Sequence, residues 1–285
     1  MTTATRDLYC VMGHPVAHSR SPWIHQRFAA LTDQALDYER QLVPLDGFIQ
    51  AVQHFAQAGG RGCNVTVPFK HEAAQCADSC SPRVHLAGAA NTLVLAQGRI
   101  HADNTDGLGL VADITRNAGV PLAGRDVLLV GAGGAGAGVL GPLLEQGPRS
   151  LVVANRTLAR AQALVQSHSE LAALQKTKLL ALDLQGLEHD FDLIINATAS
   201  SLEGAGVPVP AHVLRPGCLA YDMMYGPAAQ GFLHWATQHG AQARDGLGML
   251  VEQAAEAFAL WRGVRPPAAQ VLAELRALLQ AEAVA

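Results

Sequence analysis

A glycine-rich turn between a short apolar run and a helical segment is the feature that most constrains this chain. Residues 127–136 read Val-Leu-Leu-Val-Gly-Ala-Gly-Gly-Ala-Gly, so a predicted strand leads directly into the pattern Gly-x-Gly-x-x-Gly. In this context Gly131 permits a tight turn, Gly133 lets a pyrophosphate approach the main chain, and Gly136 lets the helix pack on the strand. Free N–H groups at the helix N-terminus face the phosphates. The alternative is an ordinary loop in a chain with 28 glycines, but a second strand at the expected distance favours dinucleotide binding.

The end of that second strand distinguishes between the two pyridine dinucleotides. An NAD site usually carries Asp or Glu about twenty residues past the glycines, where the carboxylate holds the ribose 2′-hydroxyl. Here the strand at 151–155 ends in Asn155, followed by Arg156 and Thr157, with Arg160 one turn later. No carboxylate repels a 2′-phosphate, and the planar guanidinium of Arg156 can bind one. The sequence therefore favours NADP, and Thr157 is also expected to be the N-cap of the next helix.

Length and composition predict two domains of the α/β class. A chain of 285 residues is long for one compact domain, and its 49% hydrophobic and 15% charged residues exclude a disordered protein. Strand-like runs at 179–182, 191–196 and 219–222 alternate with helical segments, which indicates a parallel, doubly wound sheet.

Charge and cysteine usage limit the partners and the location. A net charge of −4 lacks the excess of positive charge that is typical of nucleic-acid-binding proteins. The five cysteines form no recognisable metal or disulfide framework, so we expect free thiols in a reducing compartment and no metal site. No signal peptide and no apolar run of about eighteen residues is recognised. We therefore expect a cytoplasmic protein with no membrane partner. The sequence leaves open whether it is a monomer or homodimer.

Polar residues ahead of the glycine-rich turn are candidates for binding and proton transfer. Ser21 precedes Pro22 at the start of a predicted helix, so it is expected to be the N-cap; with Ser19 it could also seat a substrate carboxylate. Lys70 follows a predicted strand in a chain with 17 Arg and only three Lys, and lysine, unlike arginine, can exchange a proton. An ordinary surface lysine is the alternative. Asp106 opens another helix, which is expected to run through Ala118 and which Asp106 could simply cap.

Two further candidates lie towards the C-terminus. Residues 247–261 repeat apolar side chains at helical spacing, which predicts one buried stripe. Gln253 lies off the centre of that stripe, where it could touch a ligand, although a solvated glutamine is the default. Met223 follows the predicted strand at 219–222, so it either packs or contacts a nicotinamide.

The chain resembles one enzyme family, the shikimate dehydrogenases of the aromatic amino-acid pathway, along nearly its whole length. The matching motifs, in the order of the family, are GHPVAHSRSP at 13–22, NVTVPFK at 64–70, AANTL at 89–93, NTDG at 104–107, GAGGA at 131–135, NRT at 155–157, YDMMY at 221–225 and DGLGML at 245–250. Each motif is modest alone, but together they are highly specific.

The resemblance implies an enzyme that reduces 3-dehydroshikimate to shikimate with NADPH. It implies a discontinuous α/β substrate-binding and catalytic domain at 1–106 and 247–285, and a Rossmann-type NADP-binding domain at 107–246. Lys70 and Asp106 are the implied catalytic pair. The implied substrate-binding residues are Ser19, Ser21, Thr66, Asn91, Tyr225 and Gln253. The implied cofactor-binding residues are Gly131, Ala132, Gly133, Gly134, Ala135, Asn155, Arg156, Thr157, Arg160, Met223 and Gly246.

The chemistry agrees with these roles, and one departure from the family pattern bears on the cofactor. Hydride delivery to a ketone leaves charge on the oxygen, so a group such as Lys70 must supply a proton or stabilise that charge. The family often has an arginine just after the glycine turn, where this chain has Ala137. Because this possible phosphate-binding group is missing, Arg156 and Arg160 are expected to be the main phosphate-binding groups.

Two alternative functions remain open from the sequence. An NAD-dependent quinate/shikimate dehydrogenase is expected to carry an acidic residue where Asn155 stands. A non-catalytic protein that senses shikimate-like ligands does not require the Lys70 and Asp106 pair.

Overall fold

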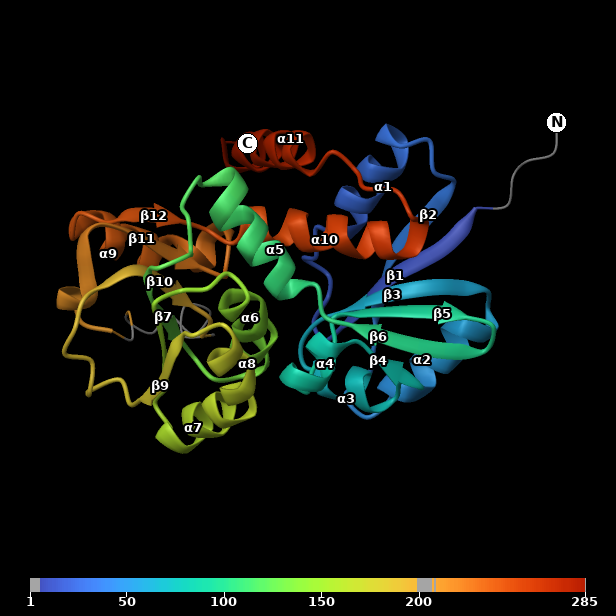
Figure 1. Cartoon of the computed structure of the whole chain (residues 1–285). Coiled ribbons are helices and arrows are strands. Elements are labelled where there is room, and N and C mark those ends of the chain that lie inside the picture. The colour runs from blue at the N-terminus through green and yellow to red at the C-terminus, as the bar shows by residue number, and fades with distance from the viewer. Residues whose placement is uncertain (1–5, 199–206, 208, 285) are drawn as a thin grey trace. The chain divides into compact units, whose positions relative to one another are not determined.

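Two six-stranded sheets organise the chain (Figure 1). The computed structural model describes residues 6–198, 207 and 209–284. The chain divides into two compact units, one comprising Met1–Gly109 with Val251–Ala285 and the other Leu110–Leu250. The boundaries expected from the sequence follow residues 106 and 246, whereas the two compact units divide after residues 109 and 250.

The first unit is built on a mixed sheet in the order β2-β1-β3-β5-β6-β4. Its strands are β1 Asp7–Gly13, β2 Leu36–Leu42, β3 Gly60–Val65, β4 Ser79–Cys80, β5 Thr92–Ala96 and β6 Arg99–Asp103. Its helices are α1 Ser21–Leu31, α2 Phe48–Gln57, α3 Lys70–Gln75, α4 Pro82–Ala87, most of α10 Leu247–Arg262, and α11 Ala268–Val284. Strand-like runs at 91–96 and 99–102, separated by Gln97 and Gly98, predict a hairpin, and β5 does pair antiparallel with β6.

The C-terminal segment completes the core of the first unit. In α10 the side chains of Val251, Ala254 and Phe258 are fully buried, which confirms the predicted apolar stripe. Phe258 lies edge-on to Phe28 of α1, with ring centroids 5.6 Å apart. Trp261 donates from Nε1 to the Leu93 carbonyl of β5 at 3.0 Å. These contacts explain why a segment remote in sequence belongs to this unit.

The second unit contains a sheet in the order β12-β11-β10-β7-β8-β9, in which all neighbours are parallel. Its strands are β7 Asp126–Val130, β8 Ser150–Ala154, β9 Lys178–Leu182, β10 Phe191–Asn196, β11 Leu214–Asp222 and β12 Gln242–Arg244. Its main helices are α6 Gly134–Leu144, α7 Leu158–Ser167, α8 Ser169–Leu174 and α9 Gln230–Gln238. The short helices are η1 Asp113–Asn117, η3 Ala211–Val213 and η4 Gly226–Ala229. Read from the other edge this is the 3-2-1-4-5-6 order of doubly wound dinucleotide-binding folds, so the predicted fold class is confirmed.

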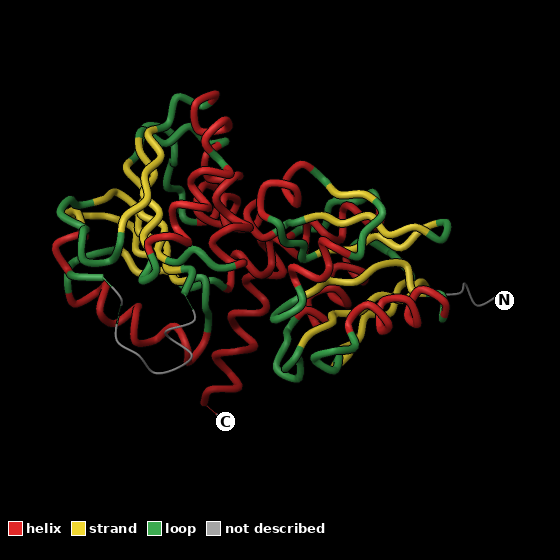
Figure 2. Tube along the Cα trace, turned by 90° about the horizontal axis from the view of Figure 1, so that it is seen from below, coloured by secondary structure: helices red, strands yellow, loops and turns green. Residues whose placement is uncertain are grey.

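Helices flank the strands of each sheet (Figure 2). In the second unit, Phe232 and Ala236 of α9 pack on one face of the sheet, against a cluster that includes Leu128 and Ile194. Helix α5, Asp106–Ala112, was predicted to run on to residue 118, but it changes to π-helical geometry at Asp113. Within the residues that the structure describes, no helix combines the length and apolar character needed to cross a membrane.

Candidate active site

Lys70 and Asp106 form an ion pair in the first unit. Lys70 is the first residue of α3 and Asp106 is the first residue of α5, and Lys70 Nζ donates to Asp106 Oδ2. The two side chains are only 19% and 9% exposed, so the pair is largely shielded from water. Lys70 is therefore not an ordinary surface lysine, and Asp106 does more than begin a helix.

Amide and hydroxyl groups surround the Asp106 carboxylate. Asn91 Nδ2 donates to Asp106 Oδ1 at 2.8 Å, and it also lies 3.0 Å from Thr105 Oγ1 and 3.2 Å from Gln253 Oε1. The default expectation of a solvated Gln253 is wrong, because packing of α10 leaves this side chain only 8% exposed. The backbone N–H of Asp106 donates to Asn104 Oδ1 at 3.1 Å, which fixes the start of α5.

The two predicted carboxylate-binding serines lie at the start of α1. The prediction that Ser21 is the N-cap is wrong: α1 begins with Ser21 itself, and Arg20 occupies the N-cap position. The Ser19 hydroxyl instead accepts from the Ser21 N–H at 3.3 Å. Arg40 donates twice to the Ser19 carbonyl, at 2.9 and 2.6 Å, and so anchors this loop. Thr66 follows β3 directly and is half-buried in the same unit.

The glycine-rich turn of the second unit has the geometry that pyrophosphate binding requires. Gly131 has a φ of 109°, which side chains disfavour. A Cβ on Gly136 would lie 2.2 Å from the Gly131 carbonyl oxygen, so the predicted close packing of helix on strand is confirmed. A Cβ on Gly133 would meet none of the described atoms within 4 Å. The main chain at Gly133, just before α6, is therefore open to a phosphate.

Asn155 connects this turn with the residues after β8. Its Oδ1 accepts from the Ala132 N–H at 3.2 Å, and its Nδ2 donates to the Thr157 carbonyl at 2.9 Å. Thr157 occupies the N-cap position of α7 as predicted, but its side chain makes no capping hydrogen bond. Arg156 and Arg160 are both exposed at this strand end, where their guanidinium groups are accessible to a 2′-phosphate.

The remaining candidates of the second unit follow β11. The Met223 N–H donates to the Asn196 carbonyl at 3.0 Å, and the Gly246 N–H donates to the Met224 carbonyl at 2.8 Å. A Cβ on Gly246 would lie 2.2 Å from the Met223 carbonyl oxygen, so only glycine fits there. Tyr225 is half-buried at the N-cap position of η4. It is the one predicted substrate-binding residue that lies in the second unit.

A buried ionic cluster near these residues was not predicted from the sequence. Asp113 is fully buried and accepts from Arg244 Nε at 2.7 Å and from the Tyr221 hydroxyl at 2.8 Å. Burial, with the Asp113 charge, raises the pKa of Tyr221 well above its usual value, and hydrogen bonding to Asp113 raises the pKa of Arg244. The cluster joins η1 to the ends of β11 and β12. Its three members are far apart in sequence, so no local pattern reveals it.

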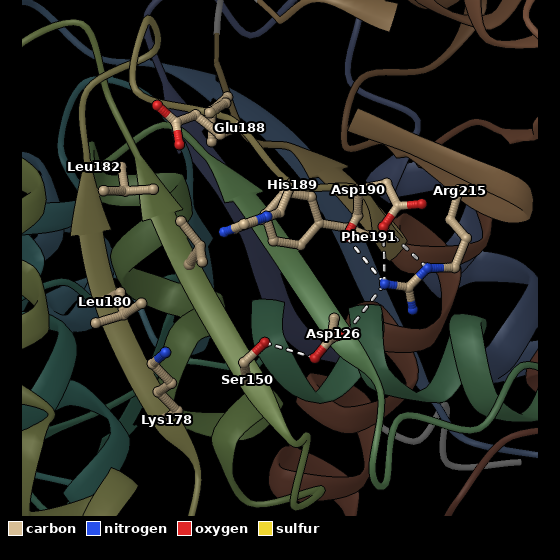
Figure 3. Close-up of a pocket in the computed structure, with 12 residues that line it drawn as sticks. Asp126, Ser150, Lys178, Leu180, Leu182, Glu188, His189, Asp190, Phe191 and Arg215 are labelled. Carbon is tan, nitrogen blue, oxygen red and sulfur yellow. Dashed lines mark hydrogen bonds and ion pairs between the residues drawn. The ribbon is translucent and has the colours of Figure 1, made fainter. Parts of the chain in front are cut away.

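A cavity of about 330 Å³ lies in the second unit. Asp126, Ser150 and Lys178 begin β7, β8 and β9, and they line this cavity with Arg215 of β11 (Figure 3). The glycine-rich turn follows the opposite end of β7. The cavity also extends along β9 to Leu182, whose carbonyl accepts from the Asn155 N–H at 3.2 Å, but none of the predicted site residues lines it.

Metal chemistry has no candidate centre in the part of the chain that the structure describes. No group of three or more His, Cys, Asp or Glu side chains there is arranged to hold a metal ion. All five cysteines are free thiols.

Three family models match successive parts of the chain. Residues 11–93 match the shikimate dehydrogenase substrate binding domain. Residues 113–203 match the shikimate/quinate 5-dehydrogenase model, and residues 246–276 match the shikimate 5′-dehydrogenase C-terminal domain. The first match lies within the N-terminal part of the first unit. The last match begins at residue 246, just before the C-terminal part of that unit, and continues into it.

Curated proteins and solved structures agree with these matches. The chain is 78% identical over 281 residues to the NADP(+) shikimate dehydrogenase of Acidovorax ebreus, covering 99% of this chain and 100% of that protein. It is 55% identical over 284 residues to the corresponding protein of Cupriavidus necator, covering 98% and 96%. A structure of an Ael1 enzyme from Pseudomonas putida matches with a TM-score of 0.87 and 46% identity, over 94% of this chain and 98% of that one. The Thermus thermophilus shikimate 5-dehydrogenase in complex with NADP(H) and shikimate matches with a TM-score of 0.82 and 32% identity, over 95% and 98%. The chain therefore belongs to the shikimate dehydrogenase family.

Proposed function

We propose that this protein catalyses the reversible, NADPH-dependent reduction of 3-dehydroshikimate to shikimate, a step of chorismate and aromatic amino-acid biosynthesis. The observation that carries the proposal is the shielded Lys70–Asp106 pair, with the amides of Asn91 and Gln253 beside it. This arrangement combines a proton-exchanging ammonium with several groups that can bind the hydroxyls of a ring substrate.

Lys70 and Asp106 carry out the proton transfer of the reaction. Bound NADPH supplies the hydride that reduces the ketone carbon. The ketone oxygen then gains a proton from the Lys70–Asp106 pair, and the reverse reaction returns it. The ammonium of Lys70 also stabilises the charge that develops on the oxygen, and shielding from water strengthens that interaction. Asp106 orients Lys70 and accepts hydrogen bonds from a substrate hydroxyl.

The other candidates of the first unit hold the rest of the substrate. In our proposal the hydroxyls of Ser19 and Ser21, at the N-terminus of α1, bind the substrate carboxylate. Thr66, Asn91 and Gln253 bind ring hydroxyls. Tyr225, a residue of the second unit, is also proposed to bind substrate.

The second unit supplies the cofactor contacts. Residues 131–135 bind the pyrophosphate through the main chain, and Arg156 and Arg160 bind the 2′-phosphate, with Asn155 and Thr157 shaping the loop. Met223 and Gly246 contact the nicotinamide half. The open main chain at Gly133 and the exposed guanidinium groups support this assignment.

The direct test is an NADPH-oxidation assay with 3-dehydroshikimate, run beside quinate with NADP⁺ and with NAD⁺. We expect rapid turnover with 3-dehydroshikimate and NADPH and little with the other pairs. Absence of turnover with 3-dehydroshikimate, in a folded protein that binds shikimate, would instead support a sensing protein.

An NAD-dependent quinate/shikimate dehydrogenase is the second candidate. The family model over 113–203 covers both substrates, and a Listeria monocytogenes shikimate 5-dehydrogenase of 27% identity and TM-score 0.84 was solved in complex with shikimate and NAD. The asparagine at position 155, where an NAD site usually has a carboxylate, makes this candidate the weaker one. A clear preference for NAD⁺ in the same assay would favour it.

We also propose a cytoplasmic location and a monomeric or homodimeric state. The five free thiols support a reducing compartment. Fractionation of cells and light scattering of the purified protein test the two proposals.

A further inference from the structure

A series of buried hydrogen bonds connects the interior of the first unit with Asp106. Tyr38, in β2, is 3% exposed, and its hydroxyl donates to Asn64 Oδ1 at 2.7 Å. Asn64 Nδ2 donates to the Asn91 carbonyl at 3.3 Å and to Thr92 Oγ1 at 3.1 Å. Thr92 Oγ1 donates to Asn91 Oδ1 at 2.9 Å, and Asn91 Nδ2 donates to Asp106 Oδ1 at 2.8 Å.

Backbone groups fix the direction of these bonds. The Thr105 N–H can only donate, and it donates to Asn91 Oδ1 at 2.8 Å, so Asn91 Nδ2 must face Asp106. The Asn91 carbonyl can only accept, so Asn64 presents its Nδ2 to Asn91 and its Oδ1 to Tyr38. The buried Oδ1 of Asn64 therefore requires a donor, and the Tyr38 hydroxyl supplies it.

His25 of α1 holds the Tyr38 ring in place. The two rings are stacked in parallel, with centroids 4.2 Å apart and an interplanar angle of 2°. Burial lowers the pKa of His25 to about 3, and the nearby Asn64 acts in the opposite direction. The imidazole is therefore neutral near pH 7 and adds no charge beside the bonded series. Among the described residues, neither ring nitrogen has a well-aligned hydrogen-bond partner, so the ring serves as a packing surface.

We propose that Tyr38 is a positioning residue of the active site: its hydroxyl fixes the Asn64 amide, and Asn64 with Thr92 holds Asn91 against the carboxylate of Asp106. The inference rests on the proposed dehydrogenase function. Without the hydroxyl, Asn64 Oδ1 would lose the donor that lies 2.7 Å away, in a residue that is only 6% exposed. Loss of a hydrogen-bond donor to a buried oxygen is unfavourable, so the Asn64 amide rotates towards other donors and releases Asn91 and Thr92.

The first test compares Tyr38→Phe with the matched control Tyr9→Phe. Tyr9 lies in the adjacent strand β1, is 2% exposed, and its hydroxyl accepts from Arg262 Nη1 at 3.5 Å, apart from the Asp106 network. For shikimate oxidation we expect Tyr38→Phe to lower kcat/KM about tenfold, the effect of losing one buried hydrogen bond. The KM for NADP⁺ should not change, and Tyr9→Phe should stay within about twofold of wild type. Equal activity of the two variants would overturn the proposal.

A double-mutant cycle separates positioning from general stability. If Tyr38 acts through Asn64, Tyr38→Phe should have no further effect on kcat/KM in an Asn64→Ala background. Thermal unfolding of all variants identifies any loss that comes from misfolding. Independent, multiplicative effects of the two substitutions would contradict the inference. A wild-type protein without shikimate oxidation would contradict the proposed function itself.

Discussion

At the scale of the residue, environment rather than residue type distinguishes Lys70 from the other lysines and supports its proposed role in proton transfer. The chain has three lysines, and Lys176 and Lys178 are exposed. Lys70 is 19% exposed and paired with Asp106, which is 9% exposed. Its rarity in an arginine-rich chain draws attention to the lysine that the fold pairs with Asp106, but its partner could be identified only by resemblance to a family or by the fold.

Replacing Lys70 with Ala tests its role in proton transfer. We expect kcat to fall about 10²–10⁴-fold, the usual contribution of a general acid or base, with a smaller change in the KM for shikimate. Lys178→Ala, at an exposed position that begins β9, should retain wild-type kinetics. Steady-state kinetics of both variants provides the measurement, and unchanged turnover in Lys70→Ala would remove this residue from the mechanism.

Replacing Arg156 with Ala tests the preference for NADPH. The exposed guanidinium can bind the 2′-phosphate that only NADPH carries, so the KM for NADPH should rise about tenfold or more. The KM for NADH should change little. Arg99→Ala, at an exposed position of β6, controls for the loss of one positive charge. Equal weakening of both cofactors would assign the 2′-phosphate to another group.

At the scale of the element, periodicity predicted most strands and helices, whereas the details of their ends depended on the fold. The glycine-rich turn, the hairpin at 91–102 and the apolar stripe of α10 follow from local patterns, and the structure has all three. Ser21 and Thr157 were expected to cap helices, but neither side chain does so. A capping bond depends on the rotamer that neighbouring segments allow, and the sequence around the cap does not contain that information.

The contact between β3 and α10 is specific enough to be tested. A Cβ on Gly62 would lie 2.5 Å from Trp261 Nε1 and 2.7 Å from the Leu93 carbonyl oxygen. Gly62→Ala should therefore lower the free energy of unfolding by about 1–3 kcal/mol through overpacking. Gly231→Ala, in α9, meets open space and should leave stability unchanged or raise it by up to about 1 kcal/mol. Thermal unfolding distinguishes the two, and equal stability of both variants would show that Trp261 can move away.

At the scale of the whole molecule, an ion-pair cluster at the amino ends of the second sheet makes stability depend on pH. Hydrogen bonding to Arg149, with smaller contributions from Ser150 and Arg215, lowers the pKa of Asp126 from 3.8 to about 2 despite partial burial. A lowered pKa in the folded state means that the stabilisation is complete above about pH 4 and disappears as the pH falls towards 2.

Asp126→Asn should lower the free energy of unfolding at pH 7 by at most about 2 kcal/mol and flatten its dependence on pH between about 4 and 2. Asp46→Asn removes an exposed carboxylate and should leave both properties unchanged. Urea unfolding across this pH range gives the comparison. If both variants retain the wild-type dependence on pH, other carboxylates cause the acid sensitivity.

The sequence by itself determined the fold class, the position of the glycine-rich turn and the absence of a carboxylate at residue 155, because these features depend on local spacing and residue type. Only the tertiary structure decided which remote groups meet. It buried Gln253 beside Asn91, it joined Asp113 to Tyr221 and Arg244, and it aligned Tyr38 with Asn64. The physical reason is that these contacts connect residues on different strands and helices, whose register and packing are fixed by the complete core rather than by any one segment.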